Sequence, residues 1–546
     1  MTGEAYRKGE DTPPLLTETI GEMLEKTVGR FGDREAIVEV QSGRRWTWRE
    51  LNEDVDRVAT GLLDLGVKKG DRVGIWAPNC AEWTITQYAT AKIGAILVNI
   101  NPAYRSHELA YVLNQSEISM VIAMVSFKTS EYKQMLLDVQ SETPTVRKLI
   151  FFGEDSWNDL MSTEADVDRI HEVMNGLEQN EPINIQYTSG TTGFPKGATL
   201  SHRNILNNGY FMTETQAWTE EDRVCLPVPF YHCFGMVMGN LGALTHGTCT
   251  VIPAPAFDPV ITLDAVVAEK CTALYGVPTM FIAMLAELDK NPRDLSSLRT
   301  GVIAGSSAPI EVAKRIVSDM NMEGITNCYG MTETSPVSCQ TRMDDNLQRR
   351  TETVGRVLPH IEIKVVDPAT GETVGYGETG EYCTKGYSVM LGYWNNEEKT
   401  AEAVVDGWMH TGDLATMDEE GYVNIVGRLK DMIIRGGENV YPREIEEFLY
   451  THPDIEDVQV VGVPDEKYGE ELCAWIKMKP GASEHLDSER VREFCSGKIT
   501  HFKIPRYVIV ADEFPMTVTG KIRKVDMRQT SIEQLGLEKA AEIKHA

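Results

Sequence analysis

The first helix that the hydrophobic pattern predicts lies just beyond residue 47. Apolar residues between positions 51 and 62 recur at spacings of three and four, which places them on one face of a helix. Thr47, with Glu50 three positions later, forms the capping-box pattern that opens such a helix. Gly66 is expected to end it, because a glycine commonly follows the last helical turn.

Short apolar runs alternate with helical stretches over much of the chain. Residues 72–76 and 95–100 are predicted to be buried strands, with a helix at residues 83–92 between them. The same alternation returns at residues 263–276 and 300–321. This alternation predicts parallel sheets covered by helices, and such sheets bind ligands at the carboxyl ends of their strands.

One of these carboxyl ends is rich in small polar residues. The strand expected at residues 301–304 is followed by Gly305, Ser306 and Ser307, and Pro309 suits the first turn of the next helix. The loop is therefore a candidate part of a binding site.

The pattern changes in the last third of the chain. Residues 353–393 are rich in glycine and partly alternate between apolar and polar positions, which predicts an antiparallel, barrel-like subdomain. A compact α+β unit is expected to begin between Gly427 and Asp431. Its predicted pieces are two helices and two strands, at residues 442–450, 488–497, 458–463 and 471–478.

Composition narrows the range of partners and compartments. The chain has 53 Lys and Arg against 82 Asp and Glu, a formal charge of −29, so nucleic acid is an unlikely partner. The ten cysteines form no CxxC pair, which favours reduced thiols in a cytoplasmic protein. Residues 1–14 lack the apolar core of a signal peptide, and no apolar run is long enough for a membrane span.

The strongest chemical signal is the ten-residue run from Thr188 to Gly197. Its hydroxyls and glycines supply donors that can surround a phosphate chain, and a lysine adds positive charge. A Walker loop would need Gly-Lys-Ser/Thr, whereas here Pro195 precedes the lysine and Gly197 follows it. The predicted phosphate-binding residues are Thr188, Ser189, Gly190, Thr191, Thr192 and Lys196.

This run resembles the phosphate loop of the adenylate-forming superfamily, which includes acyl-CoA synthetases, nonribosomal adenylation domains and luciferases. Further motifs follow in the order of that family, and the resemblance covers roughly residues 17–526. It implies an α/β fold: a large N-terminal domain of two helix-covered mixed sheets plus a small β-barrel-like subdomain, then a small mobile α+β domain. The implied boundaries are an AMP-binding domain at 1–427, a hinge at 428–430 and a mobile domain at 431–546.

The resemblance implies a nucleotide site built from several motifs. Tyr329 would stack on adenine, Thr332 would bind the α-phosphate, and Glu333 would hold Mg²⁺. Asp413 would accept the ribose hydroxyls beside Arg428. The loop of Gly305, Ser306 and Ser307 would border adenine and the acyl pocket.

The remaining implied residues serve catalysis and coenzyme A. Lys521 would bridge the substrate carboxylate and the α-phosphate, since a cation offsets the repulsion between two anions. Lys430 would be the hinge of a domain rotation. His232 would flank the acyl pocket, with a gating role and a packing role both open. The loop that would line the pantetheine tunnel contains Gly436, Gly437 and Glu438.

The resulting hypothesis is an ATP-dependent acid:CoA ligase that uses Mg²⁺ and coenzyme A, and most resembles medium-chain acyl-CoA synthetases. Gly330 stands where acetate-specific relatives carry a tryptophan, which predicts a deeper acyl pocket. One alternative is a stand-alone enzyme that loads an acyl or aryl acid onto a carrier protein. Another is a nucleotide-binding regulator without catalysis, disfavoured because the motifs are intact. Homodimers are common in such enzymes and are an expectation here.

Overall fold

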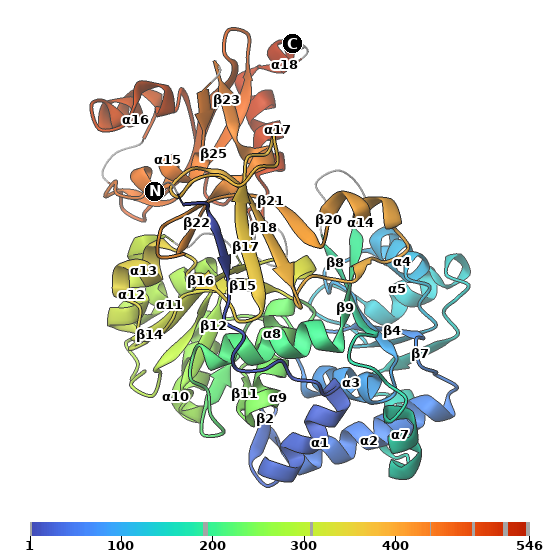
Figure 1. Cartoon of the computed structure of the whole chain (residues 1–546). Coiled ribbons are helices and arrows are strands. Elements are labelled where there is room, and N and C mark those ends of the chain that lie inside the picture. Colours follow the sequence, from blue (N-terminus) through green and yellow to red (C-terminus); the bar gives the residue numbers. More distant parts are fainter. Residues whose placement is uncertain are drawn as a thin grey trace. The chain divides into compact units, whose positions relative to one another are not determined.

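The computed structural model describes residues 3–188, 195–305, 309–436, 438–482, 486–516 and 522–541 (Figure 1). The chain divides into two compact units. The large unit comprises Tyr6–Lys364 and Cys383–His410, and the small unit comprises Met1–Ala5, Val365–Tyr382 and Thr411–Ala546. These units do not test the hinge expected at residues 428–430, which stays a prediction.

One sheet of the large unit has nine strands in the order β16-β15-β14-β13-β12-β10-β11-β2-β3. Its central strands run parallel, and β3, β15 and β16 are antiparallel additions at the two edges. Its helices and strands pack around an apolar core that includes Leu274, Phe281 and Ile316. The strands are β2 (Glu35–Glu39), β3 (Arg44–Thr47), β10 (Arg223–Cys225), β11 (Cys249–Ile252), β12 (Ala273–Gly276), β13 (Thr300–Ile303), β14 (Gly324–Gly330), β15 (Val337–Gln340) and β16 (Arg356–Val357).

The second sheet of the large unit has seven strands in the order β19-β9-β8-β5-β4-β6-β7. The strands from β8 to β7 are parallel, whereas β9 and β19 are antiparallel to their neighbours. The predicted mixed, helix-covered sheets are therefore confirmed. The strands are β4 (Arg72–Trp76), β5 (Ile96–Asn99), β6 (Met120–Ala123), β7 (Lys148–Phe151), β8 (Pro182–Thr188), β9 (Lys196–Ser201) and β19 (Gly392–Tyr393).

The predicted antiparallel region forms a six-stranded sheet, in the order β1-β17-β18-β21-β20 with β22 paired to β21. Its strands are β1 (Tyr6–Lys8), β17 (Ile361–Val366), β18 (Gly380–Gly386), β20 (Val404–Val405), β21 (Trp408–Met417) and β22 (Val423–Arg428). A five-stranded sheet forms the core of the small unit, in the order β24-β23-β26-β25 with β27 on β26. Its strands are β23 (Ile433–Arg435), β24 (Glu438–Val440), β25 (Ile455–Asp465), β26 (Gly469–Met478) and β27 (Tyr507–Val510).

The helices begin and end close to the expected positions. The capping box of Thr47 and Glu50 is present at the start of α2, and α12 begins directly after Pro309. Pro309 is thus the N-cap of that helix, so its predicted place in the first turn was wrong by one residue. None of the described helices is both long and apolar enough to cross a bilayer. The helices are α1 (Ile20–Phe31), α2 (Trp48–Asp64), α3 (Ala81–Lys92), α4 (Ser106–Gln115), α5 (Tyr132–Asp138), α6 (Asp155–Met161), α7 (Val167–Met174), α8 (His202–Glu214), α9 (Gly242–His246), α10 (Pro259–Glu269), α11 (Pro278–Lys290), α12 (Ile310–Asp319), α13 (Leu347–Glu352), α14 (Glu397–Ala403), α15 (Pro442–Leu449), α16 (Ser488–Cys495), α17 (Lys524–Leu535) and α18 (Glu538–Ala541).

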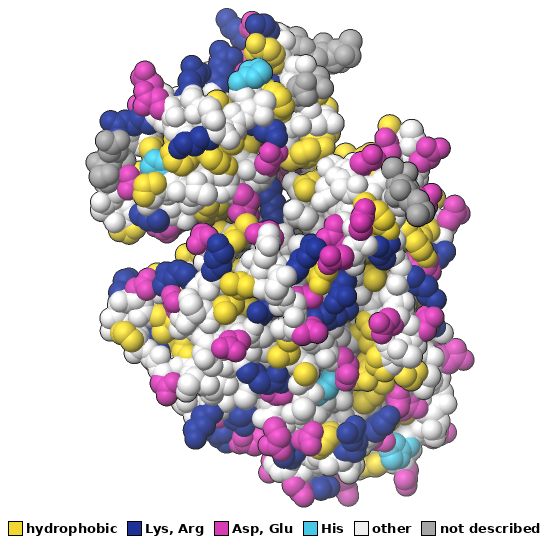
Figure 2. Space-filling view, turned by 60° about the vertical axis from the view of Figure 1, so that its left-hand side comes forward, with side chains coloured by type: hydrophobic (Ala, Val, Ile, Leu, Met, Phe, Trp, Pro, Cys, Tyr) yellow, Lys and Arg dark blue, Asp and Glu magenta, His cyan; other side chains and the backbone are white. Residues whose placement is uncertain are grey.

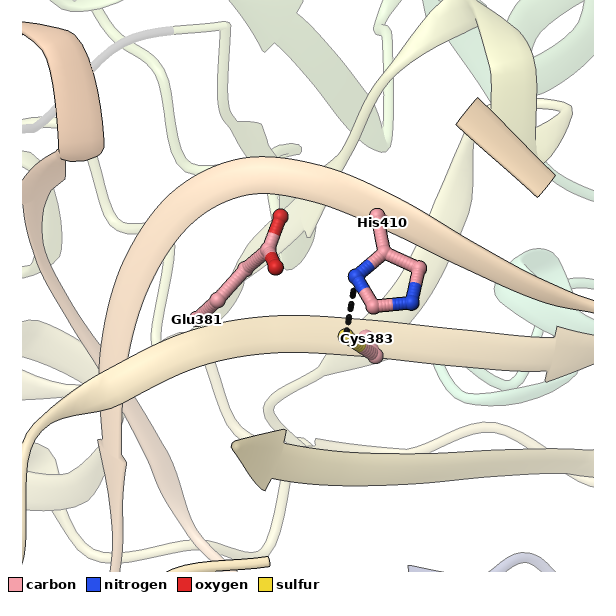
Figure 3. A group of neighbouring side chains, drawn as sticks. All are labelled: Glu381, Cys383 and His410. Atoms are coloured by element: carbon pink, nitrogen blue, oxygen red, sulfur yellow. Dashed lines mark hydrogen bonds between the residues drawn. The ribbon is translucent and has the colours of Figure 1, made fainter. Parts of the chain in front are cut away.

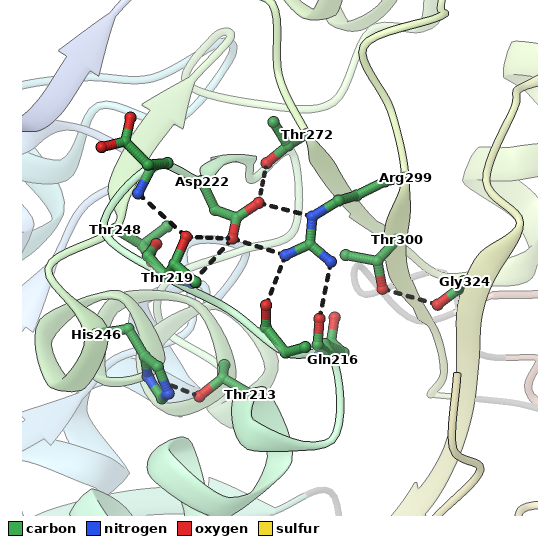
Figure 4. Close-up of polar contacts among 12 residues, drawn as sticks. Thr213, Gln216, Thr219, Asp222, His246, Thr248, Thr272, Arg299, Thr300 and Gly324 are labelled. Carbon is green, nitrogen blue, oxygen red and sulfur yellow. Dashed lines mark hydrogen bonds and ion pairs between the residues drawn. The ribbon is translucent and has the colours of Figure 1, made fainter. Parts of the chain in front are cut away.

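A buried carboxylate ties the nine-stranded sheet to the end of α8 (Figure 4). Arg299 donates from Nε and Nη2 to the two oxygens of Asp222, at 2.9 and 2.6 Å, and from Nη1 to the carbonyl of Gln216. Thr272 Oγ1 donates to the same carboxylate. Burial alone would raise the pKa of Asp222, but these donors lower it below its usual value. The network holds one end of the sheet, away from the carboxyl ends that carry the candidate site.

Candidate functional site

The two ends of the predicted phosphate loop are held by a β-hairpin. Thr188 ends β8 and lies opposite Lys196 at the start of β9, where the Thr188 hydroxyl donates to the Lys196 carbonyl at 3.4 Å. Tyr111 donates from its hydroxyl to the carbonyl of Pro195, and Trp394 donates from its amide to the carbonyl of Gly197. Ser189, Gly190, Thr191 and Thr192 lie outside the described residues. The flanks are thus anchored on two sides, which suits a loop that must present its donors in a defined place.

A lysine, a tyrosine and a glutamate meet beside this hairpin. The Nζ atom of Lys196 lies 4.4 Å from the centre of the Tyr393 ring, within the range of a cation–π contact. The Tyr393 hydroxyl donates to Oε1 of Glu333 at 2.8 Å. Glu333 lies in a short 3₁₀ turn, Thr332–Thr334, and is only 5% exposed. Thr332 is buried as well. The large unit thereby brings together three predicted site residues, Lys196, Thr332 and Glu333.

Tyr393 was not among the predicted site residues. Nothing in its immediate sequence, Leu391-Gly392-Tyr393-Trp394, indicates chemistry. It reaches the site because β19 pairs antiparallel with β9, which places Tyr393 opposite Ala198, two residues beyond Lys196. Burial and the nearby Glu333 carboxylate raise the pKa of Tyr393, so its hydroxyl stays protonated and acts as a donor at physiological pH.

The strand that leads to Glu333 ends in an irregular pairing. Tyr329 and Gly330 close β14, and the register with β15 shifts between them. A Cβ atom on Gly330 would lie 1.8 Å from the carbonyl oxygen of Pro336, so the backbone of the opposite strand excludes any side chain. Close backbone packing is therefore enough to require glycine at position 330. The missing side chain is not by itself a measure of acyl-pocket depth.

The second predicted loop of this unit follows β13. Gly305 has a φ of +94°, a left-handed conformation that favours glycine. Ser306 and Ser307 lie outside the described residues. His232 precedes the π-helical segment η2 (Phe234–Leu241), and its Nδ1 accepts the amide N–H of Phe234 at 3.2 Å. This contact fixes the ring against the backbone and leaves both proposed roles of His232 as proposals.

All ten cysteines are buried and free of disulfide bonds, in agreement with the predicted reduced thiols. Sγ of Cys233 donates to the Gln186 side chain at 3.2 Å, and burial raises the pKa of Cys328 to about 12. A thiol with a raised pKa is a poor nucleophile, so Cys328 is suited to packing rather than to nucleophilic attack.

Cys383 on β18 contacts the ring of His410 on β21. Their Sγ and Nδ1 atoms are 3.5 Å apart, and Figure 3 shows the imidazole directed toward the thiol. No spacing in the sequence indicated this pair, because 27 residues separate them. His410 lies three residues before Asp413, so the contact holds the chain just ahead of a predicted ribose-binding residue.

The predicted ribose-binding pair lies in the small unit. Asp413 and Arg428 are directly opposite on β21 and β22, and Arg428 Nε lies 3.1 Å from Asp413 Oδ1. The Asp413 residue is 7% exposed, whereas the Arg428 side chain is 52% exposed. The preceding turn is fixed by Glu381, whose carboxylate accepts the amide N–H of Gly412 at 3.0 Å. A held carboxylate beside an exposed guanidinium suits the binding of a sugar hydroxyl.

The predicted hinge lysine follows this pair. Lys430 lies in the short turn Leu429–Asp431, where partial burial and the positive charge of Arg428 lower its pKa below the usual value. Gly436, with φ +60°, forms the turn between β23 and β24. Gly437, Lys521 and the side chain of Glu438 lie outside the described part of the structure.

The fold of the large unit, with Lys196 and Glu333 both held by one tyrosine, is that of an adenylate-forming α/β enzyme. The chain belongs to the AMP-binding enzyme family, which matches residues 24–394, and the C-terminal domain of that family matches residues 444–521. The predicted superfamily is therefore confirmed.

Relatives match almost the whole chain. The protein YngI of Bacillus subtilis is 48% identical, covering 96% of this chain and 99% of the relative. The mitochondrial medium-chain acyl-CoA ligase ACSF2 of Danio rerio is 44% identical, covering 98% and 91%. Among solved structures, ATP-bound MatB from Rhodopseudomonas palustris is 28% identical, with a TM-score of 0.84 and coverage of 94% and 99%.

Proposed function

We propose that this protein is an AMP-forming acid:CoA ligase that acts on medium-chain fatty acids. In the first step an oxygen of the acid attacks the α-phosphorus of ATP, and the bond to pyrophosphate breaks to give an acyl-adenylate. In the second step the sulfur of coenzyme A attacks the acyl carbon, the carbon–oxygen bond to AMP breaks, and the thiol proton is released. The observation that carries this proposal is the buried Glu333 carboxylate and the Lys196 ammonium held around one tyrosine.

Magnesium fits the residues at this place. Glu333 is a buried carboxylate with one oxygen already hydrogen-bonded, and a hard oxygen ligand of this kind suits Mg²⁺, which also takes phosphate oxygens and waters. Glu333 would hold the ion, and bound Mg²⁺ would offset the negative charge of the phosphates. Lys196 and the phosphate loop would bind the phosphate chain, and Thr332 would donate to the α-phosphate.

The other predicted roles follow from the same proposal. Tyr329 and the loop of Gly305, Ser306 and Ser307 would border adenine, and Asp413 and Arg428 would bind the ribose. Lys521 would bridge the carboxylate and the α-phosphate during adenylation. Gly436, Gly437 and Glu438 would line the passage for the pantetheine arm of coenzyme A, after a rotation of the C-terminal domain about Lys430.

The acid is the part of the proposal that needs a direct test. The medium-chain assignment is supported by the printed name of the ACSF2 relatives and by the resemblance of the sequence to medium-chain acyl-CoA synthetases. We expect pyrophosphate release with MgATP to peak for acids of about six to ten carbons, in a panel from acetate to C16 that includes benzoate. Acyl-CoA should form only when coenzyme A is added. Adenylation without transfer to coenzyme A would favour the carrier-protein alternative, and no turnover of any acid would favour the regulatory one.

Two substitutions should separate the two half-reactions. Lys521→Ala is expected to abolish most acyl-adenylate formation while sparing thioester formation from supplied acyl-AMP, because its charge is needed only where two anions meet. Lys430→Pro should do the reverse, because proline restricts the backbone rotation at the hinge. Both half-reactions are measured on each variant by single-turnover assays. Equal loss of both steps in both variants would contradict the rotation.

The assembly and the location belong to the same proposal. We expect a homodimer in the cytoplasm, on the basis of what is common among such enzymes and of the reduced, buried cysteines. Light scattering on the purified protein would give the mass of the assembly directly.

A further inference from the structure

We infer that Tyr393 is a positioning residue that keeps Lys196 and Glu333 apart, so that both charges stay available for the metal–nucleotide complex. The inference rests on the proposed function, since it assigns Lys196 to phosphate and Glu333 to Mg²⁺. It concerns a residue that none of the sequence motifs includes.

The position of the ring follows from strand pairing. Tyr393 lies opposite Ala198 in the antiparallel pair of β19 and β9, and Lys196 is two residues away on the same face of β9. The Tyr393 amide donates to Oγ1 of Thr400 at 2.9 Å, which ties the backbone of this short strand to α14.

The glutamate is brought to the other end of the same ring. The carbonyl of Glu333 accepts the amide N–H of Met390 at 2.9 Å, three residues before Tyr393, so the 3₁₀ turn and the β19 segment are joined through their backbones. The side-chain bond from the Tyr393 hydroxyl to Oε1 then sets the direction of the carboxylate. Tyr393 is itself only 6% exposed, so its packing holds both contacts.

A half-buried ammonium and a buried carboxylate that share one neighbouring ring would otherwise attract one another. Among the residues that the structure describes, Lys196 and Glu333 do not approach each other within the 4.0 Å of an ion pair; each contacts Tyr393 instead. Each group instead has a weaker partner, the π-face for the ammonium and the phenol hydroxyl for the carboxylate. The ammonium can leave the π-face for phosphate at small cost, and the phenol hydroxyl can stay on Oε1 while the carboxylate binds Mg²⁺. A direct Lys–Glu ion pair would have to be broken first.

Two substitutions separate the hydroxyl from the ring. Tyr393→Phe removes only the bond to Glu333 and should weaken Mn²⁺ binding in the presence of ATP about 10-fold, because a hydrogen bond to a charged group is worth at least that factor. Tyr393→Leu also removes the ring, so Lys196 can pair with Glu333. It should weaken Mn²⁺ binding further and should also weaken ATP binding measured without metal, which Tyr393→Phe should leave near the wild-type value.

The measurement is Mn²⁺ binding by electron paramagnetic resonance, with ATP present and without acid or coenzyme A. The matched control is Tyr88→Phe. Tyr88 lies on α3, and its buried hydroxyl donates a hydrogen bond of 3.0 Å to the carbonyl of Asn240. That variant should lose stability without any change in Mn²⁺ affinity. Thermal unfolding of all variants checks that each is folded.

A coupling test excludes a merely structural effect. If Tyr393 acts through Glu333, adding Tyr393→Phe to a Glu333→Gln variant should lower Mn²⁺ affinity by less than two-fold, against about 10-fold in the wild type. Equal effects in both backgrounds, or unchanged Mn²⁺ affinity in folded Tyr393→Phe, would overturn the inference. A wild-type protein that turns over no acid would overturn the proposed function instead, since the binding measurement needs no turnover.

Discussion

Replacing Glu333 with glutamine is expected to lower the rate of acyl-adenylate formation by about 100- to 1,000-fold. Glutamine has nearly the same shape and can still accept the hydrogen bond of Tyr393, so the substitution removes the negative charge with little change in packing. Without that charge the site should hold Mg²⁺ weakly, and the charge that develops on the phosphates would be poorly offset. Pyrophosphate release at saturating ATP and acid measures the effect.

The dependence on metal concentration distinguishes this cause from a general loss of function. Raising Mg²⁺ should partly restore the rate of Glu333→Gln, because mass action compensates for weak binding. The control is Glu402→Gln, a glutamate of the same unit that lies on α14 and pairs with the surface residue Lys399. It should keep the wild-type rate. A Glu333→Gln variant with wild-type rate at low Mg²⁺ would show that another group holds the metal.

Replacing Lys92 with methionine is expected to destabilise the protein by about 3–5 kcal/mol. The Lys92 side chain is fully buried at the meeting of three helices, with Nζ 2.6 Å from Oδ1 of Asp56 on α2 and 3.1 Å from Oε1 of Glu25 on α1. Methionine fills a similar volume but carries no charge, so the buried Asp56 carboxylate loses its cationic partner. Urea unfolding at pH 7.5 measures the change.

A surface lysine on the same part of the chain provides the control. Lys26 pairs with Glu18 while 51% of its side chain is exposed, so Lys26→Met should cost no more than about 1 kcal/mol. A double variant, Lys92→Met with Asp56→Asn, should recover part of the lost stability because it also removes the unpaired charge. Equal losses for Lys92→Met and Lys26→Met would contradict the burial argument.

The destabilisation by Lys92→Met should also depend on pH. Burial raises the pKa of Asp56 even beside Lys92, and loss of the lysine should raise it further. A carboxyl group whose pKa is higher in the folded than in the unfolded state makes the protein less stable as pH rises and more stable as pH falls. The deficit of Lys92→Met should therefore be smaller at pH 5 than at pH 7.5.

Local chemistry in the sequence predicted much of the secondary structure. The strand at 72–76 and the capping box of Thr47 matched the structure, because apolar runs and cap residues act over a few positions. Pro309 was misplaced by one residue, which is the usual limit of local signals at helix ends. The family was also predicted correctly from the sequence, because several motifs that resemble those of the superfamily occur in the same order.

The arrangement of those motifs depended on contacts between distant segments. Tyr393 contacts both Lys196 and Glu333 because β19 pairs with β9, nearly 200 residues away in the sequence, and no local pattern encodes that pairing. Contacts between separate segments likewise brought Cys383 to His410 and placed the Pro336 carbonyl against Gly330. The sequence by itself determined the elements, the family and the candidate groups. Tertiary packing alone decided which groups meet, because distances between side chains depend on sheet register and burial rather than on neighbouring residues.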